Sequence, residues 1–285
     1  MNIFEETRFI MKKYGITANK KLGQNFLIDD NAIEAIVSSS NITKEDLVIE
    51  IGPGLGTLTK PLLESAGKVI CIELDDRMIK ILEDRFNLYN NFELIHNDVL
   101  KVDFKKMILE NKNEQIKHAK VVANLPYYIT TPIIMKLLEE RLDIESITVM
   151  IQKEVADRLV TKPGESNTGA ITYAINYYTE PSRIYEVDKT SFIPAPEVNS
   201  TIIKLNVLKT PSVKAANEDL MFKIIKAAFM QKRKTLLNGL SNSNLFGNKE
   251  EIEKMLTALG MDLKIRGEKL TLENYAQITE YLSKI

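Results

Sequence analysis

The stretch LVIEIGPGLG, residues 47–56, decides how this 285-residue chain folds. Its first half is a short apolar run, which predicts a buried strand, and its glycines predict a tight turn into a helix over residues 57–66. Gly52 and Gly54 carry no side chain, so the backbone here can approach a ligand closely. In a doubly wound sheet, the crevice beyond such a strand is the usual nucleotide site. The glycine pattern alone is weak evidence, because a structural turn explains it equally well.

Strand and helix signals alternate along the chain after this stretch. Apolar runs predict further strands over residues 68–74, 92–96, 119–123 and 146–152. Asp75 and Thr131 are suited to cap two of the helices that follow, with Pro132 at the first helical position of the second one. Repeated units of this length predict an α/β fold whose mostly parallel sheet is covered by helices on both faces.

The pattern changes in the second half of the chain. Residues 178–187 and 198–208 are rich in β-forming residues and predict an antiparallel pair at the edge of the sheet. Beyond them the chain reads as helical, beginning with one long helix over residues 220–240. We therefore expect a Rossmann-like α/β domain with a basic N-terminal arm over residues 1–208, and a small all-α domain over residues 209–285.

Composition excludes several classes of protein. The chain is 44% hydrophobic and 27% charged, which is ordinary for a globular protein and excludes disordered and fibrous classes. With one cysteine and two histidines, it has no intrachain disulfide and no Cys/His zinc cluster. There is no apolar run of membrane-spanning length and no secretory leader, so we expect a cytoplasmic protein.

The net charge of −1 hides an uneven distribution. Residues 45–110 carry five more acids than bases, whereas residues 1–28 and residues 218–240 each carry three more bases than acids. Two basic ends around an acidic middle favour an anionic partner that is bound away from the central fold. A solvated charged face explains the same pattern, so charge alone leaves both interpretations open.

Two carboxylates lie at the ends of predicted strands. Glu73 lies 21 positions after Gly52, where a carboxylate can accept hydrogen bonds from both ribose hydroxyls of a bound nucleoside. Asp98 follows the next strand and can accept a hydrogen bond from the amine of an adenine. These features fit a nicotinamide dinucleotide and S-adenosylmethionine equally well.

The sequence NLPYY, residues 124–128, separates these two alternatives. The amine of an adenine is a poor nucleophile, because its lone pair is delocalised into the ring, so its methylation requires acceptors for the N–H bonds and an aromatic face under the base. The Asn124 side chain and the Leu125 carbonyl can supply the acceptors. Pro126 fixes the turn, and Tyr127 can stack on the base. A dehydrogenase has no need of this loop, which therefore favours methyl transfer.

With this loop, the chain resembles the ribosomal RNA adenine N6-dimethyltransferase family. The matching segments, which run over almost the whole chain, are LGQNFL (22–27), EIGPGLGTLT (50–59), IELD (72–75), NLPYYIT (124–130), FIPAPEVNS (192–200), FMQKRKTLLNGL (229–240) and RGEKL (266–270). Together they are specific, whereas the glycine motif alone is not.

The resemblance implies S-adenosylmethionine as the cofactor and assigns residues to it. These are Asn25 and Leu27 over the methionine end, Gly52 and Gly54 of the glycine loop close to it, Glu73 at the ribose, Asp98 at the adenine, and Asn124 between cofactor and target. Phe192 resembles the family's second aromatic, which should hold the target base against Tyr127. The chain departs from the family at Tyr128, where many members carry Asn, and at Gly267, where Ala is usual. We expect the first departure to change the hydrogen bonds of the loop without loss of catalysis, and the second to be minor.

The reaction implied by the resemblance is N6,N6-dimethylation of two adjacent adenosines in a loop near the 3′ end of small-subunit (16S) rRNA. The substrate would be a pre-assembled 30S particle, and the enzyme a monomer without metal or membrane attachment. Contacts to RNA phosphates are expected from the two basic ends of the chain, namely Lys20, Lys21, Lys232, Arg233 and Lys234.

Two alternatives remain. An erythromycin-resistance methyltransferase, which dimethylates one adenine of large-subunit rRNA, shares the NLPY loop, but the segments at 229–240 and 266–270 favour the small-subunit enzyme. A noncatalytic assembly factor on the same fold is disfavoured by the intact Gly52, Glu73 and Asn124.

Overall fold

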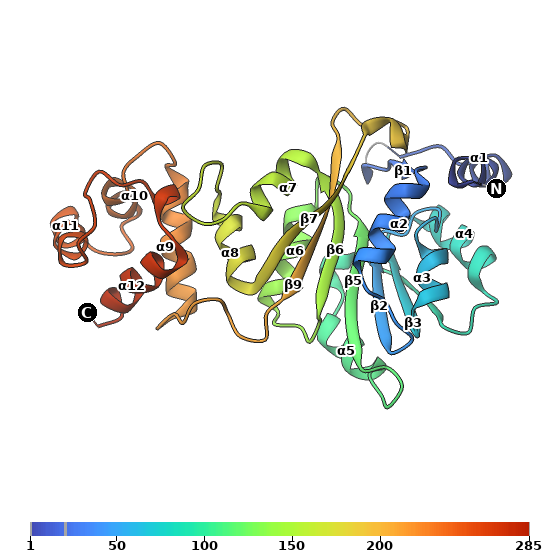
Figure 1. Ribbon diagram of the computed structural model, residues 1–285, viewed down its shortest axis with the longest axis horizontal. Coiled ribbons are helices and arrows are strands. Elements are labelled where there is room, and N and C mark those ends of the chain that lie inside the picture. Colours follow the sequence, from blue (N-terminus) through green and yellow to red (C-terminus); the bar gives the residue numbers. More distant parts are fainter. Residues whose placement is uncertain (1, 20–21, 285) are drawn as a thin grey trace. The chain divides into compact units, whose positions relative to one another are not determined.

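The computed structural model describes residues 2–19 and 22–284, which form two compact units (Figure 1). One unit comprises the chain up to Ala156 together with Ser182–Val207, and the other comprises Asp157–Pro181 together with the segment that starts at Leu208. The expected boundary at residue 208 coincides with one point of this division. The difference lies in residues 157–181, which the sequence placed with the sheet and which the structure groups with the C-terminal helices.

The first unit is built on a seven-stranded sheet in the described part of the chain, with the strand order β4-β3-β2-β5-β6-β9-β7. The strands are β2 (Asp46–Ile51), β3 (Lys68–Glu73), β4 (Phe92–His96), β5 (His118–Asn124), β6 (Ser146–Gln152), β7 (Thr179–Val187) and β9 (Ser200–Val207). Pairs among β2 to β6 are parallel, whereas β6 and β9 are antiparallel. The predicted mostly parallel sheet with an antiparallel edge is confirmed. Because β2 lies between β3 and β5, the order reverses there, which opens the crevice where such sheets bind nucleotides.

Helices cover this sheet. They are α2 (Asp30–Ser39), α3 (Thr59–Ser65), α4 (Asp76–Phe86), α5 (Phe104–Asn111) and α6 (Thr130–Glu139), whereas α7 (Lys153–Val160) runs across the division between the units. Alternate residues of the central strands, such as Val48, Val69 and Val122, share one core with residues of α2, α3 and α4. Side chains alternate between the two faces of a strand, so their neighbours face the opposite layer.

The two predicted helix caps have different outcomes. Asp75 caps α4, since its side chain accepts a hydrogen bond from the backbone N–H of Arg77. Thr131 does not cap α6, which begins at Thr130. The reason is local: the hydroxyl of Thr130 donates to the carbonyl of Pro126 at 3.2 Å, which extends the preceding turn into the helix. Pro132 still lies in the first turn, where its missing N–H costs nothing.

The N-terminal arm is tied to the sheet by a second, two-stranded sheet. After α1 (Ile3–Tyr14), the chain forms β1 (Phe26–Leu27), which pairs antiparallel with β8 (Phe192–Ile193). Leu27 lies opposite Phe192 in this pairing. The segments around residues 26 and 192, which are far apart in sequence, therefore lie side by side.

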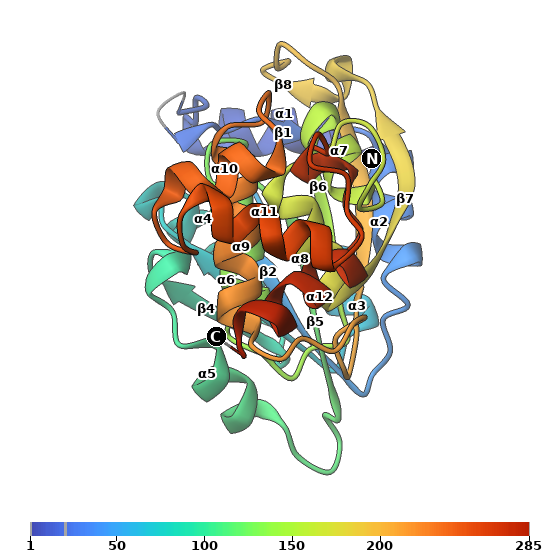
Figure 2. The ribbon, with the colours of Figure 1, turned by 90° about the vertical axis from the view of Figure 1, so that its left-hand side faces the viewer.

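The second unit is helical (Figure 2). It contains α8 (Ala170–Tyr178), α9 (Glu218–Met230), α10 (Leu236–Ser243), α11 (Lys249–Ala258) and α12 (Leu272–Leu282), with α9 packed against α8, α10 and α12. Tyr173 of α8 makes ring contacts with Phe229 and Tyr275, which explains why α8 belongs to this unit. No helix in the described ranges has the length and apolarity of a membrane span.

The predicted single helix over residues 220–240 is wrong, because α9 ends at Met230 and α10 begins at Leu236. The N–H of Lys234 bonds to the carbonyl of Gln231 at 2.8 Å, which closes a turn. Thr235 then caps α10 by accepting from the N–H of Asn238.

Candidate active site at the carboxyl ends of the parallel strands

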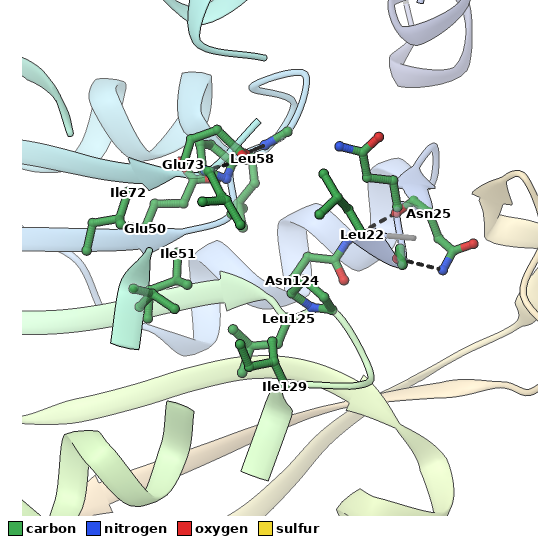
Figure 3. A pocket seen from close by; sticks show the side chains of 18 of the residues that line it. Leu22, Asn25, Glu50, Ile51, Leu58, Ile72, Glu73, Asn124, Leu125 and Ile129 are labelled. Atoms are coloured by element: carbon green, nitrogen blue, oxygen red, sulfur yellow. Dashed lines mark hydrogen bonds between the residues drawn. The ribbon is translucent and has the colours of Figure 1, made fainter. Parts of the chain in front are cut away.

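A cavity of about 1140 Å³, including its open mouth, lies beyond the carboxyl ends of the central strands (Figure 3). The N-terminal arm, the glycine loop, the ends of β3 and β5 and the turn after β4 all contribute to its wall. Ten residues singled out from the sequence line it, namely Asn25, Leu27, Gly52, Gly54, Glu73, Asp98, Asn124, Leu125, Pro126 and Tyr127. Because the carboxyl ends of parallel strands meet at one edge, the residues from Gly52 to Tyr127 converge here, and the N-terminal arm adds Asn25 and Leu27.

The glycine loop requires glycine at the positions that line the cavity. Gly52 and Gly54 have φ values of 67° and 58°, in the left-handed region that side chains disfavour. The N–H of Gly52 bonds to the carbonyl of Ile72 at 2.9 Å, which ties the loop to the end of β3. A Cβ on Gly54 would lie 3.5 Å from the Phe26 ring, so the loop also packs against the N-terminal arm.

Glu73 is held by backbone donors at the end of β3. One carboxylate oxygen accepts from the N–H groups of Leu74 and Asp75 at 2.8 and 2.9 Å, and the other accepts from Gly54 at 3.1 Å. Burial raises the pKa of this carboxyl group, and the three N–H donors partly offset that effect. A carboxylate has about four acceptor positions, so Glu73 keeps capacity for a further hydroxyl donor.

Glu50 is a cavity residue that the sequence reasoning quoted but gave no role. It lies near the end of β2 with 1% of its surface exposed, and it accepts from the Thr59 hydroxyl at 2.6 Å and the Cys71 thiol at 3.3 Å. Burial raises its pKa to about 7. The signal in the sequence was an acid inside the apolar run LVIEI. Glutamate is rarely fully buried unless its carboxyl group has a bonding partner.

The NLPY loop presents its groups from the end of β5. The side-chain amide of Asn124 donates to the carbonyl of Asn25 at 3.4 Å, and Figure 3 shows the two residues joined across the cavity wall. Leu125 is buried and its N–H bonds to the carbonyl of Met150 at 3.2 Å. The Tyr127 hydroxyl lies 2.7 Å from that of Ser200, the first residue of β9. The loop is therefore anchored to the arm and to two strands.

Phe192 differs from the expectation. It is 3% exposed, lies in the hydrophobic core, and is not among the described residues that line the cavity. Its backbone partner Leu27 belongs to the same hydrophobic core and also lines the cavity, whereas the Phe192 ring is enclosed by core side chains. In this conformation it offers no open face opposite Tyr127.

Asp98 lies at the turn after β4, where it also caps a short 3₁₀ turn by accepting from the N–H of Leu100 at 3.0 Å. Its neighbour Asn97, which the sequence reasoning did not select, lines the cavity too. Within the described chain, no group of three His, Cys, Asp or Glu is arranged to hold a metal ion.

The expected RNA-binding residues lie outside the cavity. Lys20 and Lys21 fall outside the described residues. Lys232, Arg233 and Lys234 are exposed in the turn between α9 and α10 rather than in a helix, and Lys232 lies 3.8 Å from the Glu268 carboxylate.

A parallel sheet with a glycine loop, a strand-end carboxylate and an Asn-Leu-Pro-Tyr loop around one cavity defines a class, the methyltransferases with a Rossmann-like fold. Comparison with known proteins narrows this class. The family model of the ribosomal RNA adenine dimethylases matches residues 15–284. The chain belongs to this family.

Similar proteins cover nearly the whole chain. The ribosomal RNA small subunit methyltransferase A of Alkaliphilus oremlandii is 45% identical over 280 residues, 98% of this chain and 97% of that protein. Its counterpart from Bacillus pumilus is 47% identical over 280 residues, 98% and 96% of the two chains. A dimethyladenosine transferase from Plasmodium falciparum superposes with a TM-score of 0.75 at 28% identity, over 91% of this chain and 98% of that one. The 23S rRNA methyltransferase ErmE, at TM-score 0.68 and 24% identity over 91% of this chain and all of that one, shares the fold.

Proposed function

We propose that this chain uses S-adenosylmethionine to dimethylate N6 of two adjacent adenosines near the 3′ end of small-subunit (16S) rRNA. The family match and the names of the full-length relatives support the reaction and the substrate. The observation that carries the proposal is the position of Asn124 and Tyr127, which share one cavity with Gly52 and Glu73.

The residues of the cavity fit this cofactor. Glu73 has acceptor capacity for ribose hydroxyls, Asp98 and Asn97 line the same cavity and would accept from the adenine amine, and the glycine loop carries no Cβ at its edge. Asn25 and Leu27 of the arm would cover the methionine end. S-adenosylmethionine supplies a methyl group on a positively charged sulfur, which is activated for transfer without a metal or an enzyme nucleophile.

The chain itself positions the adenosine. The Asn124 amide nitrogen donates to the Asn25 carbonyl, which leaves the amide oxygen to accept an N–H bond of the target amine. The carbonyl of Leu125 is the second acceptor and the Tyr127 ring stacks on the base, whereas the buried Phe192 would have to leave its core position to contact it. Holding the amine in line with the methyl donor lowers the entropic part of the activation barrier, because the two reacting groups are already oriented when they bind. The excess proton leaves to water after transfer.

The basic residues would contact the RNA outside the cavity. Lys232, Arg233 and Lys234 in the α9–α10 turn, together with Lys20 and Lys21 of the arm, would contact phosphates and so position the RNA without reading its sequence. The substrate is a pre-assembled 30S particle, where a loop offers an unstacked adenosine. The enzyme acts as a cytoplasmic monomer.

Methyl transfer to defined substrates tests this function. Unmethylated small subunits, naked small-subunit rRNA and large subunits are each incubated with the chain and labelled S-adenosylmethionine, and the products are mapped by position. We expect dimethylation of two adjacent adenosines in the small subunit and little reaction on naked RNA. Methylation confined to the large subunit would instead indicate an erythromycin-resistance enzyme. Binding of the cofactor without transfer to any substrate would indicate a noncatalytic assembly factor.

A further inference from the structure

Tyr128 differs from its neighbour Tyr127, although both line the cavity. The Tyr127 side chain is half-buried and its hydroxyl bonds to Ser200. Tyr128 is 59% exposed. A single exposed aromatic side chain is ordinary on a protein surface, but this one lies in the wall of the cavity, where its ring can contact what binds there.

The Tyr128 ring is supported on one side by the N-terminal arm. A Cβ on Gly23 would lie 3.3 Å from Cδ1 and 3.5 Å from Cε1 of this ring, so the ring rests against a glycine whose φ is +62°. The same Cβ would lie 3.8 Å from Cβ of Pro126, which places the arm and the NLPY loop in direct contact. The ring is therefore held at the mouth with its other side open.

We propose that Tyr128 is a stacking platform for the nucleobase directly adjoining the adenosine in the cavity. This inference rests on the proposed function. Extruding a base from its stack leaves the neighbouring base with an uncovered face. An aromatic ring beside the cavity covers that face, and stacking of this kind tolerates any base. Of two adjacent adenosines, one is the 3′ neighbour and the other the 5′ neighbour, so a ring on one side of the mouth stacks on the partner adenosine in one round of methylation and on a different flanking base in the other.

The test compares Tyr128→Leu and Tyr128→Phe with the wild type on unmethylated small subunits. The matched control is Phe9→Leu, because Phe9 of α1 is also 59% exposed and is not among the described residues that line the cavity. We expect Tyr128→Leu to raise KM for the particle by about tenfold, and to increase the share of particles modified at one adenosine only. Tyr128→Phe and Phe9→Leu should match the wild type. The Kd for S-adenosylhomocysteine should be unchanged in all three variants.

Two results would refute the proposal that Tyr128 is a stacking platform. The first is a wild-type KM in Tyr128→Leu, and the second is a parallel loss of S-adenosylhomocysteine affinity, which would show that Tyr128 supports the cofactor side of the arm through Gly23. A binding assay without turnover separates this inference from the proposed function. An unmethylated small subunit reconstituted with 2-aminopurine beside the target adenosine should be quenched by the wild type and not by Tyr128→Leu, at protein concentrations that saturate the particle in both cases. Equal fluorescence in the two refutes stacking, whether or not the wild type methylates small subunits.

Discussion

The hydrogen bond between Tyr127 and Ser200 should determine how well the aromatic face of the site is oriented. The two hydroxyls lie 2.7 Å apart, and Ser200 has no exposed surface. A hydrogen bond of this kind contributes about 1 kcal/mol net to stability, whereas a fully buried hydroxyl without a partner costs about 1–3 kcal/mol. Tyr127→Phe leaves the buried Ser200 hydroxyl without this partner. Ser200→Ala leaves the half-buried Tyr127 hydroxyl, which water can reach more easily.

These magnitudes predict a specific pattern in a double-mutant cycle. Tyr127→Phe should cost about 1–3 kcal/mol and Ser200→Ala about 1 kcal/mol. The double variant should cost clearly less than their sum, because no unpaired hydroxyl remains. Urea unfolding measures these free energies, and far-UV circular dichroism confirms that each variant is folded.

Methyl transfer by the same three proteins tests the functional part. If the bond orients the ring, each variant should lose the same factor in kcat, about 10- to 100-fold, because a freed ring misplaces the base. Replacing Ser200 by Thr, which keeps a hydroxyl, should restore part of the loss. Wild-type kcat in Ser200→Ala, or losses that multiply in the double variant, would refute the reasoning.

Other parts of the molecule are open to similar tests. Asn124→Ala should abolish methyl transfer and leave S-adenosylhomocysteine affinity and the unfolding midpoint close to wild type, since this side chain makes one long hydrogen bond of 3.4 Å; retained turnover would remove Asn124 from the reaction. Changing Lys232, Arg233 and Lys234 together to Ala should weaken binding to the small subunit and reduce the slope of log K against log salt by about 2, and an unchanged slope would make them an ordinary solvated surface. Glu50 has its folded pKa raised from 4.5 to about 7, so the folded state binds its proton more tightly than the unfolded state, and the free energy of unfolding should fall as pH rises from about 4.5 to 7, by on the order of 3 kcal/mol. Glu50→Gln should show a smaller pH dependence in thermal unfolding, in which the contribution of Glu73 remains, and an equal pH slope in both proteins would contradict the assignment.

The sequence alone determined the α/β fold and most of the cavity wall. Apolar runs that alternate with helix signals predict parallel strands. Asp75 predicts the start of a helix, because its carboxylate can accept a hydrogen bond from a backbone N–H of the first turn. Once the strands are known to be parallel, their carboxyl ends must meet at one edge, so Gly52, Glu73, Asp98 and Asn124 could be placed together without coordinates.

Only the tertiary structure decided which side chains contact one another across long stretches of sequence. The bond from Tyr127 to Ser200 joins residues 73 positions apart, and Phe192 is buried in a core to which the N-terminal arm and distant strands contribute. Neither is visible in local patterns, because strand register depends on the packing of the whole sheet. The break before α10, in contrast, is a local event with a signal in the sequence. Five polar residues, 231–235, interrupt the apolar spacing of residues 220–240, and there the bond from Lys234 to Gln231 closes a turn and Thr235 caps the next helix.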